Sequence, residues 1–145
     1  ALAAGCAACP DWVKPNAAEA AQLTGRPFGK RSDILSGAKA ILALGPRRAL
    51  VSLGRRGAAL AVEDVVCLAE PPAVTEASAV GAGDALLAGA LWAWGEGMTP
   101  REVVGWAVAS GTAAAMQKGT VMPPLARIRQ VYGQVQVISF QGLVA

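Results

Sequence analysis

Apolar positions along this chain fall into two kinds of run, and the two kinds follow one another in turn. Short unbroken apolar runs predict strands at 11–13, 49–53, 58–62, 65–68 and 135–138. Longer runs with apolar residues at i, i+3 or i+4 predict helices at 17–24, 32–44, from the glycines near 82 to about 94, at 101–117 and at 125–131. Strands alternating with helices indicate a layered α/β fold with a mostly parallel sheet.

Two of the predicted helices differ in how they are expected to be buried. In the helix that ends near 94, Leu87, Leu91 and Trp94 are spaced i, i+4 and i+7 and predict one buried stripe. The helix at 101–117 is apolar on nearly all sides, so we expect it to be buried. Small residues at 107–115 permit close approach of a neighbouring helix or of a flat ring, and helix packing is the more economical explanation.

Gly81 and Gly83 lie between an extended segment that contains two prolines and the apolar run of the next helix. Glycine permits a tight turn and leaves no Cβ between its N–H group and an anion. The first turn of a helix adds N–H donors without a partner in the helix, together with the positive end of the helix dipole. The segment is therefore typical of a phosphate site.

Asp84 follows these glycines directly and has two interpretations. A carboxylate at this place can take a proton from a hydroxyl that attacks a phosphoryl group. It can also complement the positive end of the helix dipole, which is a common use of aspartate in a first turn. Position alone does not decide between the two.

Composition excludes several classes of function. The chain has no histidine, which excludes Ser-His-Asp triads and His-Glu-x-x-His zinc sites. Its net charge is +3, and the arginines at 47–48 and 55–56 form separate pairs, so we expect no nucleic-acid partner. No apolar run reaches the roughly 18 residues of a membrane span, so we expect no membrane partner. A chain of 145 residues is long enough for one domain with its own core.

The chain has three cysteines, which are Cys6, Cys9 and Cys67. Cys6 and Cys9 have Cys-x-x-Cys spacing, but no second pair completes a zinc site and no predicted strand precedes them as in a thioredoxin-like motif. We therefore expect reduced core thiols in a cytoplasmic protein rather than redox chemistry.

Two polar motifs have sufficient structural explanations. Asn16 is a natural N-cap for the helix that begins at 17, and Glu19 completes an Asn-x-x-Glu capping box. Gly54 and Gly57 are the residues that a plain hairpin turn needs. No Gly-Lys-Ser/Thr sequence occurs in the chain, so a nucleotide bound here is held without a P-loop.

The sequence Gly81-Ala82-Gly83-Asp84, followed by Ala88-Gly89, resembles the second signature of the ribokinase-like (PfkB-type) carbohydrate kinases. The resemblance implies an α/β/α layered, ribokinase-like fold with a mostly parallel sheet. It also implies that Asp84 is the catalytic base, and that an anion hole for the transferred phosphoryl group is formed by Gly81, Ala82 and Gly83.

Two positions near this signature distinguish branches of the family. Ala79 departs from the Thr, Ser, Pro or Val that the family usually has, so a hydroxyl contact is missing there and a nearby monovalent-cation site is not implied. Ser78 stands where ribokinase proper has Asp and is more similar to the sugar-phosphate branch.

Two further segments resemble motifs of the same family, in the family's order. Lys14-Pro15-Asn16 and Glu19 are similar to its Lys-Pro-Asn and Asn-x-x-Glu elements, which implies phosphate contacts and a magnesium ion placed by Glu19 through water. The run 52–58 is similar to its Ser/Thr-x-Gly-x-x-Gly-Ala nucleotide turn, and the helix at 101–117 to one wall of its adenine pocket. The nucleotide-binding residues so implied are Lys14, Asn16, Ser52, Leu53, Gly54, Arg55, Arg56, Gly57, Gly83 and Val108.

The resemblance extends from about Trp12 to Pro123 and corresponds to the C-terminal, nucleotide-binding half of such a kinase. It implies an ATP- and Mg²⁺-dependent kinase for a sugar phosphate of the fructose 1-phosphate or tagatose 6-phosphate type, assembled as a homodimer. The alternative is a non-catalytic nucleotide-binding or oligomerisation module, against which the intact Asp84 argues. Because the sugar-binding elements lie mainly in a preceding half, we expect these 145 residues alone to be an inactive fragment that exposes an apolar face.

Overall fold

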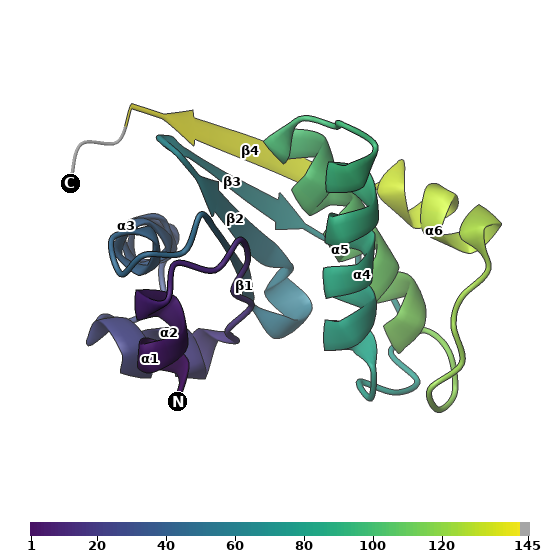
Figure 1. Ribbon diagram of the computed structural model, residues 1–145. Helices are drawn as coiled ribbons and strands as arrows, with labels where there is room; N and C mark the ends of the chain where they lie inside the picture. Colours follow the sequence, from purple (N-terminus) through teal and green to yellow (C-terminus); the bar gives the residue numbers. More distant parts are fainter. Residues whose placement is uncertain (143–145) are drawn as a thin grey trace. The chain divides into compact units, whose positions relative to one another are not determined.

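Six α-helices, four β-strands and one short 3₁₀ helix form within residues 1–142, the part of the chain that the computed structural model describes (Figure 1). In chain order they are α1 (Leu2–Ala7), α2 (Ala17–Thr24), α3 (Arg31–Leu42), β1 (Arg48–Ser52), η1 (Gly54–Arg56), β2 (Ala58–Val62), β3 (Val65–Glu70), α4 (Ala82–Gly95), α5 (Pro100–Ala115), α6 (Leu125–Tyr132) and β4 (Gln136–Gln141). The predicted helices and most predicted strands are confirmed. The strand expected at 11–13 is reduced to isolated bridges at Val13 and Asn16.

The chain divides into two compact units. The first comprises Ala1–Gly54, Ala58–Leu68 and the end of β4 from Ser139. The second comprises Arg55–Gly57 and Ala69–Ile138, so the turn between β1 and β2 belongs to a different unit from the strands it joins.

The sheet contains an antiparallel strand pair, and parallel bridges lie beside it. Its strand order is β1-β2-β3-β4, and β1 pairs with β2 in antiparallel register, with Leu50 opposite Leu60. The connection from β1 to β2 is too short for a crossover, which takes a dozen or more residues, so this pair has to be antiparallel. Parallel pairing occurs in the bridges from Val13 to Ala49 and from Asn16 to Ser52.

The core of the first unit forms where α3 packs on one face of the sheet. Ile34, Ala38 and Ile41 of α3 belong to the same buried cluster as Val51 of β1. Leu50 points to the opposite face by strand alternation and is equally inaccessible to solvent, so β1 is covered on both faces, as its unbroken apolar run predicts.

The three cysteines are free. Cys6 and Cys67 are buried, as expected of core thiols, but the expectation is wrong for Cys9, which is exposed. Burial raises the pKa of the Cys6 thiol above its ordinary value.

In the second unit, α4 and α5 run alongside each other and α6 lies against α5 (Figure 1). The predicted buried stripe of Leu87, Leu91 and Trp94 on α4 is wrong, because Leu91 is 45% exposed and the other two are only partly buried. Small residues fill most of the buried face, whose members are Ala85, Leu86, Gly89, Ala90 and Ala93. At Gly89 an added Cβ would overlap the Ser110 side chain and lie 2.8 Å from the Trp106 carbonyl oxygen, so α5 approaches the α4 backbone too closely for large side chains between them.

Aromatic rings connect α5 to its neighbours on both sides. The Trp106 ring stacks on Tyr132 of α6 with centroids 4.4 Å apart, and it forms a T-shaped contact with Trp92 of α4 with centroids 5.0 Å apart. Desolvation in this cluster raises the pKa of the Tyr132 phenol above its ordinary value.

A capping box fixes the start of α5. The Thr99 side chain accepts from the Glu102 N–H, and the Glu102 carboxylate accepts from the Thr99 N–H at 2.8 Å. This backbone hydrogen bond lowers the pKa of Glu102. A carboxyl whose pKa is lower in the folded state stabilises the fold above its unfolded pKa, and that contribution is lost as the pH falls through the lowered value.

We predict opposite effects of alanine at the glycines of α4. Gly89→Ala is expected to lower the melting temperature, because overpacking costs about 1–3 kcal/mol while helix propensity returns only about 1 kcal/mol. Gly95→Ala is the matched control, since an added Cβ at Gly95 meets no atom within 4 Å, and it should leave stability unchanged or raise it. Calorimetry of both variants tests this, and equal shifts would contradict the close packing of α4 on α5.

Candidate functional site

The glycine segment opens α4 as the sequence predicts. Gly81 is the N-cap residue and has a left-handed backbone with φ of 80°. Its carbonyl accepts the first helical hydrogen bond from the Ala85 N–H at 2.9 Å, while the Ala82 N–H donates to the Ala79 carbonyl at 3.3 Å. Among the described residues no acceptor is bonded to the N–H groups of Gly83 and Asp84. The start of α4 therefore presents adjacent free donors at the positive end of a helix.

The segment that leads into these donors is fixed to the end of α5. The N–H groups of Ala77 and Ser78 both donate to the Ala115 carbonyl, at 2.8 Å and 3.1 Å. The Ser78 hydroxyl in turn accepts from the Val80 N–H at 3.3 Å. The glycine segment is thus held by two backbone hydrogen bonds to α5 and by one contact of the Ser78 hydroxyl.

The small residues of α5 pack beneath the start of α4. A Cβ added at Gly111 would lie 3.1 Å from the Ala82 carbonyl oxygen and 3.1 Å from the Leu86 Cβ, which is tighter than an ordinary contact. Helix packing therefore explains this run of small residues. Val108 is only 1% exposed and offers no surface to a ligand, so we leave it out of the site.

Asp84 lies in the first turn of α4, and its side chain is exposed. In this position it complements the helix dipole, and it is also accessible to a substrate hydroxyl. An anion bound to the free N–H groups and a proton acceptor would then be adjacent, which is the arrangement that phosphoryl transfer to a hydroxyl needs.

In the first unit, backbone pairing brings together two of the segments predicted to bind the nucleotide. They are the segment at 14–16 and Ser52 at the end of β1. The Ser52 N–H donates to the Pro15 carbonyl at 3.0 Å, and Asn16 forms a parallel bridge with Ser52. The capping box at α2 is confirmed, because the Asn16 side chain accepts from the Glu19 N–H at 2.9 Å and the Glu19 carboxylate accepts from the Asn16 N–H at 2.8 Å. Lys14, Asn16 and Ser52 are therefore neighbours through backbone pairing.

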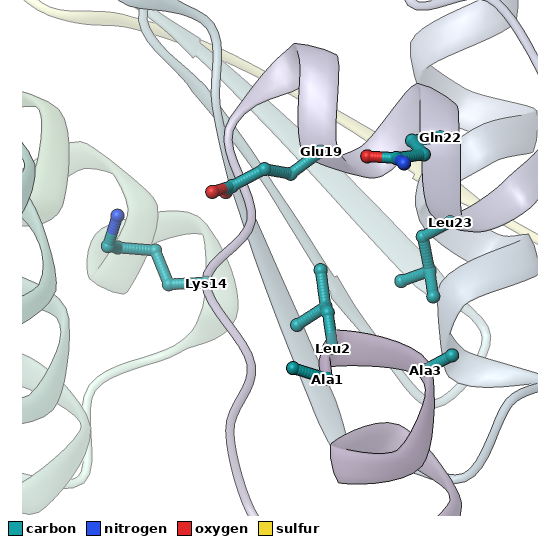
Figure 2. Close-up of a pocket in the computed structure, with 7 residues that line it drawn as sticks. All are labelled: Ala1, Leu2, Ala3, Lys14, Glu19, Gln22 and Leu23. Carbon is teal, nitrogen blue, oxygen red and sulfur yellow. The ribbon is translucent and has the colours of Figure 1, made fainter.

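A pocket of about 470 Å³ opens beside this group (Figure 2). It is lined by Ala1, Leu2, Ala3, Lys14, Glu19, Gln22 and Leu23. Figure 2 shows the Glu19 carboxylate extending from α2 towards the segment that carries Lys14. The charged ends of these side chains give the pocket one cation and one anion among mainly apolar neighbours.

The donor set at this pocket fits a magnesium ion bound mainly through water and substrate. Mg²⁺ keeps several waters and usually takes only one or two carboxylates besides substrate phosphates. One Glu19 oxygen accepts the Asn16 N–H, which leaves the other for a metal-bound water. Within residues 1–142 no cluster of three His, Cys, Asp or Glu side chains could hold a metal ion by itself.

The nucleotide turn predicted at 52–57 is a 3₁₀ helix at Gly54–Arg56 rather than a plain hairpin turn. Gly57 has φ of 95°, and a Cβ there would overlap the Ala69 carbonyl oxygen, so only glycine fits. Arg55 donates from Nε to Glu76 Oε2 at 2.9 Å. Sequence reasoning missed Glu76, because nothing local marks an ion pair between residues 21 positions apart.

The predicted residues form groups within each unit. Lys14, Asn16, Glu19, Ser52 and Gly54 belong to the first unit. The second unit contains Arg55–Gly57 and the start of α4. None of the helices in residues 1–142 is long and apolar enough to cross a bilayer.

Comparison with known proteins adds independent findings. Residues 2–126 match the family described as pfkB family carbohydrate kinase. A 1-phosphofructokinase from Rhodobacter capsulatus is 36% identical over 137 residues, which cover 94% of this chain and 43% of the relative. The crystal structure of phosphofructokinase-2 from Escherichia coli in complex with potassium matches with a TM-score of 0.83 at 30% identity, covering 92% of this chain and 44% of that one.

The likeness extends to a plant enzyme. The structure of Arabidopsis thaliana ribokinase complexed with ribose and ATP matches with a TM-score of 0.74 at 28% identity, over 84% of this chain and 40% of that one. The chain thus spans less than half the length of each of these proteins.

Proposed function

We propose that this chain, which belongs to the pfkB family of carbohydrate kinases, serves a kinase that transfers a phosphoryl group from ATP to a hydroxyl of a sugar phosphate. Its fold is the ribokinase-like α/β fold that the sequence predicts. The observation that carries the proposal is the pair of free N–H groups at Gly83 and Asp84, beside the exposed Asp84 carboxylate. The N–H groups supply hydrogen-bond donors for a negatively charged phosphoryl group, and the carboxylate supplies a proton acceptor.

In this proposal the residues at the start of α4 catalyse the phosphoryl transfer. The free N–H groups of Gly83 and Asp84 stabilise the negative charge that develops on the transferred group, and they need no reorganisation because the loop is fixed to α5. Asp84 accepts the proton of the attacking hydroxyl. The gain comes from positioning and charge stabilisation, as in phosphoryl transfer generally.

Residues of the first unit would hold the nucleotide. Lys14 provides a positive charge for phosphate, and the Ser52 N–H bonds to Pro15 of the same segment. Mg²⁺, when bound with the nucleotide, neutralises charge on the phosphates, and Glu19 would orient its water shell. Asn16 keeps Glu19 in place through the capping box.

The class of the phosphoryl acceptor is proposed from the names of the relatives rather than from residues of this chain. The names of similar proteins include 1-phosphofructokinase and ATP-dependent 6-phosphofructokinase, which favours a fructose phosphate or a related sugar phosphate. Because this chain spans less than half the length of those relatives, we propose that residues outside these 145 complete the sugar site of the full-length enzyme, which we expect to be a homodimer.

The test is ADP formation by the full-length enzyme with a panel of sugars and sugar phosphates, measured by a coupled assay. We expect turnover with sugar phosphates of the fructose 1-phosphate or tagatose 6-phosphate type, and none with the 145-residue chain alone. Nucleotide binding without turnover on any acceptor would instead support a non-catalytic module.

Glu19→Gln tests the proposed magnesium role. The amide oxygen can still accept the Asn16 N–H, so the cap is kept, but the negative charge is lost. We expect the Mg²⁺ concentration for half-maximal rate to rise several-fold with little change in melting temperature. Glu102→Gln is the matched control, because Glu102 occupies the same place in the capping box of α5. A similar Mg²⁺ response in both variants would remove Glu19 from the site.

A further inference from the structure

Arg55 and Glu76 form an ion pair that the family resemblance does not predict. The guanidinium Nε lies 2.9 Å from Glu76 Oε2. The Arg55 side chain is 86% exposed, whereas that of Glu76 is only 26% exposed. The carboxylate is thus the more buried partner, and the arginine extends from it into solvent.

The geometry of this contact leaves the anion-binding end of Arg55 available. A guanidinium has five N–H donors in a planar fork, and only the one on Nε is engaged by Glu76. The terminal amino groups, which match the oxygens of a phosphate in bidentate fashion, have no bonded acceptor among the described residues. An arginine that is already held at Nε loses less side-chain conformational entropy on binding an anion than a freely moving arginine does.

The same segment supports both the turn and the glycine loop. Gly57 packs against the Ala69 carbonyl oxygen, Glu76 contacts Arg55, and Ala77 with Ser78 bonds to the Ala115 carbonyl. All these residues belong to the second unit. The Arg55 fork is therefore anchored to the segment that leads into the proposed anion hole.

We propose that Glu76 is a positioning residue that orients the Arg55 guanidinium to bind a phosphate group of the nucleotide. The inference rests on the proposed kinase function and adds to it one residue outside the predicted motifs. A plain tether between the turn and the segment at 76–78 is the competing explanation, and the experiment separates the two.

Glu76→Ala in the full-length enzyme is expected to raise the KM for ATP by about five- to twentyfold, the range expected when a charge-assisted contact loses its alignment. The KM for the sugar phosphate should change less than about twofold. The melting temperature should also stay nearly constant, because exposed ion pairs contribute at most about 1 kcal/mol. Asp11→Asn is the matched control, since Asp11 forms an exposed ion pair with Arg47 at 3.6 Å, and its KM for ATP should not change.

A charge-swapped double variant, Arg55→Glu with Glu76→Arg, distinguishes orientation from tethering. The swap restores the attraction but places a carboxylate where the phosphate should bind, so we expect the KM for ATP to stay at least as high as in Glu76→Ala. Recovery of the wild-type KM would show a tether and overturn the inference, as would an unchanged KM in Glu76→Ala while the wild type is active. Absence of both ATP binding and turnover in the wild-type enzyme would overturn the proposed function, and this inference with it.

Discussion

Asp84→Asn is expected to lower the turnover number of the full-length enzyme by about two to four orders of magnitude, the usual contribution of a general base. The amide has the shape of the carboxylate but cannot accept the proton of the attacking hydroxyl. Asp84 is exposed, so the substitution removes no buried contact, and only a small dipole contribution is lost at the start of α4. Steady-state kinetics with ATP and the preferred sugar phosphate measures the effect.

Asp33→Asn is the matched control for this experiment. Asp33 occupies the same place in the first turn of α3, where its carboxylate accepts from the Lys30 N–H at 3.0 Å. Both variants therefore remove one negative charge near a helix N-terminus, and both should keep ATP affinity and folding. Turnover of Asp84→Asn within tenfold of the wild type would exclude Asp84 as the base and leave only its role at the helix dipole.

Features set by residues close in sequence were predictable. The capping boxes at Asn16 and Thr99 depend on residues three positions apart, and both form as the sequence indicates. The start of α4 was equally predictable from local sequence, because the left-handed backbone of the residue before the helix favours a glycine, which is Gly81. Local chemistry thus predicted where the candidate site begins.

Features set by packing between distant segments were not predictable. The apolar spacing on α4 favoured Leu91 as buried, but Gly89 and its neighbours bring α5 so close that the large side chains turn outward. The ion pair of Arg55 with Glu76 depends on how the turn meets the segment after β3. Hydrophobic periodicity reports which residues can be buried, and the partner helix decides which of them are.

Gly83→Val should lower the turnover number as much as the loss of the base does, but through loss of the N–H donors to the phosphoryl group. Its side chain would lie beside the free N–H groups of Gly83 and Asp84 and keep the phosphoryl group away from them. Each preorganised donor contributes about 3 kcal/mol in the transition state, and each 1.36 kcal/mol is a factor of about ten in rate. We therefore expect turnover to fall by about two to four orders of magnitude.

The effects of Gly83→Val on the turnover number and on ATP affinity together show whether the glycine loop acts in the transition state or only in nucleotide binding. If the donors act on charge that develops during transfer, the dissociation constant for ATP should change by less than about tenfold, because ground-state binding uses other contacts. Gly95→Val is the matched control, since it adds the same side chain to the same helix at a position with no atom within 4 Å of the new Cβ. Gly95→Val should therefore keep both turnover and ATP affinity. If Gly83→Val weakened ATP binding as much as it slowed turnover, the loop would be a binding turn for the nucleotide, and the anion hole would have to lie elsewhere.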